Sequence, residues 1–172
     1  MITGQLSSGA RLQPQQRLKI VGTPGPRLTE YPFQVVHTAR LQITTKGQGD
    51  AQDLTARVAR AVGESKLRAG TATVFVVGST AVVTTIEFEP GAISDLDRVL
   101  ERLAPRHADY RHHERWGDDN GSSHVRAALM GPSLAVPFVN GELVLGQWQQ
   151  IMLLECDTRP RTREVVLQIV GD

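Results

Sequence analysis

Several short segments of the chain combine β-branched residues with alternating apolar and polar positions. Segments of this kind, bounded by glycine, proline or asparagine, are typical of β-strands. Near the C-terminal third, Asn140-Gly141 has the composition of a tight type I′ hairpin turn. We therefore predict strands at residues 33–45, 71–78, 81–89 and 163–171, and hairpin-linked strands within residues 133–157.

Apolar positions that recur every four residues predict a first main helix at residues 50–65. Leu54, Val58 and Val62 form a stripe on one face of this segment. Asp50 is the expected N-cap, because its carboxylate can accept a hydrogen bond from a free backbone N–H of the first turn.

Two further helices are predicted later in the chain. The second main helix covers residues 94–105, with Ser94 as the expected N-cap and Pro105 as the stop. A shorter helix is predicted near residues 123–130, with a serine as the expected N-cap and Gly131 just beyond its end.

The order of these elements predicts the fold class. Strands outnumber helices, and most consecutive strands are joined too tightly for parallel crossovers. We expect a single α+β domain at residues 31–172, built mainly of antiparallel β-sheet or sandwich with the two main helices packed on it. Residues 1–30 are polar and predict an extended or partly ordered arm, with a short strand at 18–21 and a turn at 22–27.

Composition narrows the class of protein. The net charge is only +1, which does not favour nucleic acid as a partner. A single cysteine, Cys156, excludes an internal disulfide and a cysteine-based zinc site. The N-terminus lacks the apolar run of a signal peptide, and we find no segment long enough to span a membrane. We therefore expect a cytoplasmic protein.

The segment YRHHERWGDDNGSSHVR (110–126) has no helical or strand periodicity and carries most of the candidate chemistry. Its imidazoles and carboxylates are common ligands of Zn²⁺ and other divalent ions. His112 and His124 are the principal candidate metal ligands, with His113 and Asp118 as further candidates. The alternative is a solvated loop whose histidines bind nothing.

Several other side chains could bind an anion. His124 falls in the first turn of the predicted short helix, where free N–H groups favour a phosphate, and Arg126 follows two residues later. Both are candidate catalytic residues, although a capped surface helix explains the pattern equally well. Arg159, Arg161 and Arg163 share one face if that segment is extended. The further polar candidates are Asn120, Ser79 and Thr80 for an anion, and Glu87 for a metal.

Four segments in fixed order resemble the YjbQ family, also called secondary thiamine-phosphate synthase enzymes. They are VFVVGSTAVVTTIEFEPG, DYRHHERWGDDNGSSHVRAALMGPSLAVPF, GELVLGQWQQIMLLE and DTRPRTREVVLQIVG. The resemblance covers about residues 33–171. It implies a homotrimer and a pocket, often associated with a metal, that is lined by His112 and His124.

The resemblance also implies an activity. Thiamine phosphate synthase joins a pyrimidine methyl diphosphate to a thiazole phosphate and releases pyrophosphate, which would require a divalent ion such as Zn²⁺ or Mg²⁺. The alternatives are a trimer that binds a metal or a phosphorylated ligand without catalysis, and a metal-dependent phosphate-ester hydrolase. Gly78 and Ser122 stand where many relatives have histidine, and Gln147 replaces a threonine. We therefore expect a site with fewer imidazoles than in those relatives.

Overall fold

The computed structural model describes residues 35–172, which lie in one compact unit. The predicted arm, with its short strand at 18–21 and its turn at 22–27, lies outside the described residues and stays a prediction.

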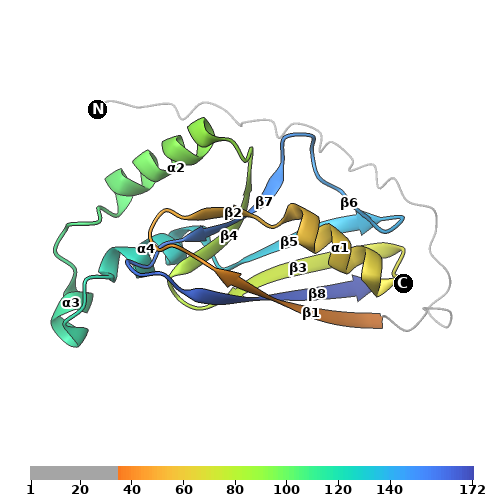
Figure 1. The fold of residues 1–172 in the computed structure, drawn as a ribbon, viewed down its shortest axis with the longest axis horizontal. Helices are drawn as coiled ribbons and strands as arrows, with labels where there is room; N and C mark the ends of the chain where they lie inside the picture. Colours follow the sequence, from red (N-terminus) through yellow and green to blue (C-terminus); the bar gives the residue numbers. More distant parts are fainter. Residues whose placement is uncertain (1–34) are drawn as a thin grey trace, which may run out of the picture. The chain divides into compact units, whose positions relative to one another are not determined.

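Two antiparallel sheets form the scaffold (Figure 1). The larger sheet has the strand order β1 (Val35–Thr44), β8 (Thr162–Gly171), β3 (Ala69–Val77), β5 (Ser133–Val139) and β6 (Glu142–Leu143). The smaller sheet has the order β2 (Ala51–Asp53), β7 (Gln150–Glu155) and β4 (Ala81–Ile86). The predicted α+β class with antiparallel sheet is therefore confirmed.

The predicted hairpin turn between β5 and β6 is also confirmed. Asn140 has φ 55° and Gly141 has φ 77°. Positive φ at both central residues is the requirement of a type I′ turn, which asparagine and glycine meet at the lowest cost.

The first main helix begins later than predicted. Helix α1 spans Thr55–Ser65, and the three residues after Asp50 form strand β2 instead. Asp53 accepts a hydrogen bond from the Thr55 N–H at 2.8 Å, whereas Asp50 accepts one from the Lys46 N–H at 2.9 Å. Asp50 is thus not the N-cap, because pairing with β7 keeps residues 51–53 extended.

The second main helix begins earlier than predicted. Helix α2 spans Pro90–Leu103, and the preceding strand ends at Ile86 rather than at Glu89. The Glu89 carboxylate accepts hydrogen bonds from the backbone N–H groups of the first turn, so Glu89 rather than Ser94 is the N-cap. Pro90 occupies the first helical turn, where its missing N–H costs nothing.

The segment predicted as an aperiodic loop contains a helix. Helix α3 spans Arg111–Trp116, and α4 spans Gly121–Met130 where the short helix was predicted. Asn120 occupies the N-cap position of α4, and no side chain caps it. The expected serine cap is therefore wrong, because Ser122 and Ser123 already lie inside the helix.

Two apolar clusters define the layers. The first fills the space between the two sheets and includes α1. The second lies on the other face of the smaller sheet, where Val82, Met152 and Leu154 pack against Leu100 of α2 and Ala127 of α4. Helices α2 and α4 are thereby fixed beside the smaller sheet, and they position the candidate site. No helix within residues 35–172 is long and apolar enough to cross a membrane.

Candidate functional site

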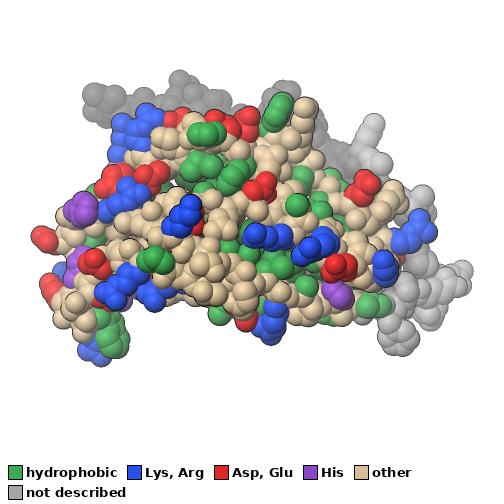
Figure 2. All heavy atoms as spheres, viewed as in Figure 1, with side chains coloured by type: hydrophobic (Ala, Val, Ile, Leu, Met, Phe, Trp, Pro, Cys, Tyr) green, Lys and Arg blue, Asp and Glu red, His purple; other side chains and the backbone are tan. Residues whose placement is uncertain are grey.

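Helices α3 and α4 bring the two principal candidate ligands together. The ring centroids of His112 and His124 lie 4.4 Å apart, with an angle of 52° between the ring planes. The Nε2 atom of His112 is 3.6 Å from Oδ1 of Asp118, and both side chains are about one-third exposed at 31% and 32%. Figure 2 shows histidine side chains beside acidic and basic ones at the left of the drawn face, in the region of α3.

Four buried oxygen atoms in the segment between the two histidines have no hydrogen-bond partner. They are Asp118 Oδ1, Asn120 Oδ1, Ser122 Oγ and Ser123 Oγ. A buried polar atom without a partner is costly and usually indicates a group that completes the site. Of these atoms, Asp118 Oδ1 is the one that lies at the pair, 3.6 Å from His112; an ionised carboxylate oxygen accepts and cannot donate, so it favours a cation or a ligand that donates hydrogen bonds.

His113 makes a structural contact rather than joining the histidine pair. Its Nε2 atom accepts a hydrogen bond from the Gly121 N–H at 3.1 Å, at the first residue of α4. Gly121 is needed there, because a Cβ atom would lie 2.5 Å from Cβ of Tyr110. As placed, His113 holds α3 against α4, and its Nε2 is not available as the additional metal ligand that we predicted.

The donor types fit a divalent metal better than their arrangement does. Two imidazoles and one carboxylate are the ligand types found at zinc sites. Among residues 35–172, however, no group of three or more His, Cys, Asp or Glu side chains is arranged to hold a metal ion. The sequence predicted which groups meet, but among the described residues these groups do not form a complete set of metal ligands.

The side chain of Arg126 is buried and already paired, so it is not placed to bind an anion. Its side chain is 2% exposed and is held between α4 and the end of α2. Nε donates to the Ala104 carbonyl at 2.9 Å and Nη2 donates to Glu101 at 2.6 Å, while Nη1 lies 3.4 Å from Asp97. The predicted catalytic and anion-binding role of Arg126 is therefore replaced by a structural one.

The predicted row of three arginines is also absent. Arg163 is buried and makes two hydrogen bonds to Glu155, at 2.7 and 2.5 Å. Arg161 donates to Asp157 at 2.9 Å, and Arg159 precedes strand β8 in a bend. The three arginines do not form a row because the chain bends at Arg159 before strand β8 begins. Two of the three guanidinium groups instead pair with carboxylates of this chain.

These pairs belong to a buried network that sequence reasoning missed. Thr45 donates to Glu155 at 2.8 Å, and Thr80 donates to Asp157 at 3.1 Å and accepts from Arg163 at 2.7 Å. Hydrogen bonds from Arg161 and Thr80 outweigh burial and hold the pKa of the Asp157 carboxyl below its ordinary value. The one available signal was Glu155, a charged residue that ends an otherwise apolar run.

The other predicted residues lie apart from one another. Thr80 is buried in the network just described, whereas Ser79 is exposed. Asn120 occupies the N-cap position of α4, and its backbone carbonyl accepts a hydrogen bond from the His124 N–H at 3.4 Å. Glu87 is exposed beyond the end of β4, and within the described residues no hydrogen bond or ion pair joins it to a histidine.

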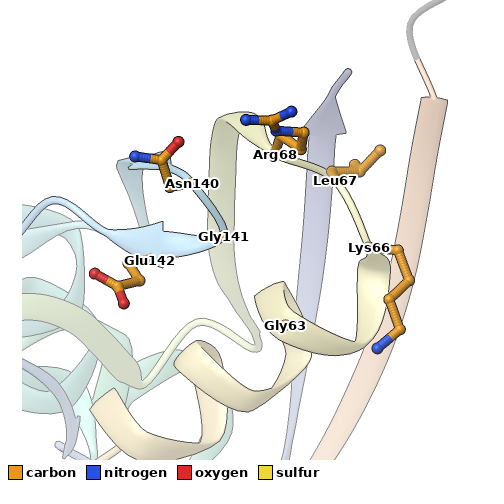
Figure 3. Close-up of a pocket in the computed structure, with 7 residues that line it drawn as sticks. All are labelled: Gly63, Lys66, Leu67, Arg68, Asn140, Gly141 and Glu142. Carbon is orange, nitrogen blue, oxygen red and sulfur yellow. The ribbon is translucent and has the colours of Figure 1, made fainter.

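A separate pocket of about 470 Å³ lies where α1 ends (Figure 3). Lys66, Arg68 and Glu142 line it together with the hairpin turn at Asn140 and Gly141. It contains no predicted site residue and no histidine, so it does not extend the site at α3 and α4.

Comparison with known proteins gives one consistent result. The family described as UPF0047 protein YjbQ-like matches residues 39–172. A UPF0047 protein of Methanothermobacter thermautotrophicus is 35% identical over 139 residues, which cover 81% of this chain and 95% of that protein. A UPF0047 protein of Methanocaldococcus jannaschii is 32% identical over 134 residues, which cover 77% of this chain and 94% of that protein.

Solved structures agree with the sequence comparisons. A YbjQ-like protein of unknown function from Sulfolobus solfataricus has a TM-score of 0.76 at 28% identity, covering 81% of this chain and 99% of that one. A hypothetical protein from Aeropyrum pernix has a TM-score of 0.72 at 29% identity, covering 79% of this chain and 99% of that one.

Proposed function

Because the chain belongs to the YjbQ/UPF0047 family, we propose that it binds a divalent metal ion beside a small phosphorylated ligand at His112, His124 and Asp118. The observation that carries this proposal is the meeting of the two imidazoles, 4.4 Å apart, with a carboxylate 3.6 Å from His112. Asp118 Oδ1 is buried and has no hydrogen-bond partner, which supports a cation at this place. Imidazole ligands favour Zn²⁺ over Mg²⁺, which prefers oxygen ligands.

The activity to test first is the synthesis of thiamine phosphate. In that reaction, a bond forms between the thiazole nitrogen and the pyrimidine methylene carbon. The bond from that carbon to the diphosphate oxygen breaks, and its electron pair leaves with pyrophosphate. A bound ion would offset the charge that develops on the diphosphate. His124, at the start of α4, would donate a hydrogen bond to the leaving oxygen through the ring nitrogen that does not bind the ion.

An assay with both phosphorylated substrates and with Zn²⁺ or Mg²⁺ tests this activity. We expect thiamine phosphate from the unmodified protein, at least about a hundredfold less from His124→Ala, which removes a metal ligand and a hydrogen-bond donor to the developing charge, and no loss from His37→Ala on strand β1. If the unmodified protein forms no product with either ion, the synthase activity is excluded.

One observation favours a second candidate, in which the site binds without catalysis. The guanidinium groups predicted to surround a leaving pyrophosphate are largely paired, Arg126 with Glu101 and Asp97, and Arg163 with Glu155. A binding protein would retain metal or phosphorylated ligand, and thermal protection would be seen without turnover. Metal analysis and thermal shift measurements therefore accompany the activity assay.

We also propose that the chain assembles as a homotrimer through the outer face of the larger sheet. Phe75 and Val77 on β3 and Val139 on β5 are 41%, 47% and 52% exposed, and among the described residues no buried apolar cluster covers this face. Exposed apolar patches of this kind are typical of interfaces. Light scattering tests the proposal: a trimer is expected, with dissociation on Phe75→Glu, and a monomeric unmodified protein would contradict it.

A further inference from the structure

A second polar pocket, of about 410 Å³, lies beside α3. The residues that line it are Gln48, Arg106, His107, Ala108, His113, Asp119 and Thr158. None of the residues proposed above as metal ligands lines it. His112 and His113 are neighbours on α3, and helix geometry turns consecutive side chains about 100° apart; of the two, only His113 lines the pocket.

Three of its polar groups are held in place by hydrogen bonds within the protein. His113 Nε2 accepts the Gly121 N–H at 3.1 Å, so in the neutral ring Nδ1 carries the hydrogen. Thr158 donates to Oδ1 of Asp119 at 3.1 Å. Groups held in this way need little reorganisation when a ligand arrives.

Arg106 retains donors for a ligand although it is already paired. Nη1 donates to Glu101 at 3.0 Å, and Nη2 donates to Asp97. These bonds use two of the five guanidinium N–H groups, and the side chain is 25% exposed. The two carboxylates orient the guanidinium while its remaining N–H groups stay available.

Donors therefore dominate the pocket, with one opposing carboxylate. Arg106, His107 and His113 can donate, whereas Asp119 can only accept when ionised. The volume falls in the range of about 300–1,000 Å³ that is usual for small-molecule sites. We propose that this pocket binds a small oxyanion, a phosphate or carboxylate group, through Arg106, His107 and His113. The site goes beyond the proposed function, because it uses none of the proposed metal ligands.

Isothermal titration of the full-length protein with inorganic phosphate tests the proposal, with acetate as a second probe to distinguish a phosphate from a carboxylate site. We expect saturable binding of at least one probe that His107→Ala weakens about tenfold, the usual effect of losing one charge-assisted hydrogen bond. Asp119→Asn should strengthen binding, because it removes the opposing charge, and a purely structural residue would not act in this direction. His37→Ala is the control and should bind as the unmodified protein does.

Imidazole NMR signals provide a measurement that needs no variant. During the same titrations, the signals of His107 and His113 should shift together while that of His37 stays fixed. Absence of saturable binding of both probes would overturn the proposal. So would unchanged affinity in His107→Ala, or loss of binding in His124→Ala, which would assign the anion to the histidine pair instead.

Discussion

Replacing Arg126 with methionine removes a buried cation while keeping most of the side-chain stem. In the folded protein Arg126 is 2% exposed and joins α4 to the last turn of α2. The substitution leaves the Ala104 carbonyl, itself buried, without its donor, and it separates Glu101 from one of its two guanidinium partners. We expect a clear loss of stability without a change of fold.

The size of this stability loss depends on how exposed the two carboxylate partners of Arg126 are. Removing one member of a fully buried ion pair costs about 3–5 kcal/mol. Here Asp97 and Glu101 are 41% and 39% exposed, so water can replace part of the lost interaction. An orphaned buried carbonyl costs about 1–3 kcal/mol. Together these considerations predict that the free energy of unfolding falls by about 2–3 kcal/mol, which corresponds to roughly 5–10 °C in Tm.

Urea unfolding followed by far-ultraviolet circular dichroism measures this loss. The matched control is Arg98→Gln, which breaks the exposed pair with Asp95 on α2, where the side chains are 64% and 69% exposed. That change should cost less than about 0.5 kcal/mol. If Arg126→Met is as stable as Arg98→Gln, Arg126 does not hold the two helices together and its assignment as a structural residue is refuted.

Three further predictions concern two paired carboxylates, the cysteine thiol and Gly121. Hydrogen bonds from Arg106 and Arg126 lower the pKa of Glu101, and hydrogen bonds from Arg161 and Thr80 lower the pKa of Asp157. The stability that these two carboxylates contribute is complete above their pKa values in the unfolded chain, about 4.3 and 3.9, and is lost as the pH falls through their lower pKa values in the folded protein. The urea midpoint should therefore decline between about pH 5 and pH 3, and a constant midpoint would show that these carboxylates do not stabilise the fold. Burial raises the pKa of Cys156 to about 12, so Ellman's reagent at pH 8 should react only after unfolding, and rapid reaction of the native protein would show that the thiol is accessible. Gly121→Ala should lower Tm and shift His113 signals, because the new Cβ meets Tyr110 at 2.5 Å; an unchanged Tm would show that α3 moves freely.

The periodic parts of the fold could be predicted because each strand or helix repeats its own burial pattern. On β8, Arg163, Val165, Leu167 and Ile169 are all buried, as the alternation requires. Helix α3 could not be predicted in this way, because its six residues contain too few turns to show a period and none of them is buried. Its position depends on the hydrogen bond from Gly121 and on close packing against Tyr110.

The histidine pair was predictable in identity, whereas the roles of the arginines were not. His112 and His124 bracket one short segment, so folding of that segment is enough to bring them together. Arg126 meets Glu101 across 25 residues of sequence, and Arg163 meets Thr80 across 83. Such partners come from other elements, and local sequence does not reveal that a guanidinium is already paired.

Metal analysis of the purified protein tests the central proposal most directly. After dialysis against Zn²⁺ and removal of free ion, mass spectrometry for metals should find one zinc per chain in the unmodified protein and in His37→Ala. His112→Ala and His124→Ala should each lose it, because either change leaves one imidazole and one carboxylate. No zinc in the unmodified protein, or equal zinc in all four proteins, would contradict a metal site at His112, His124 and Asp118.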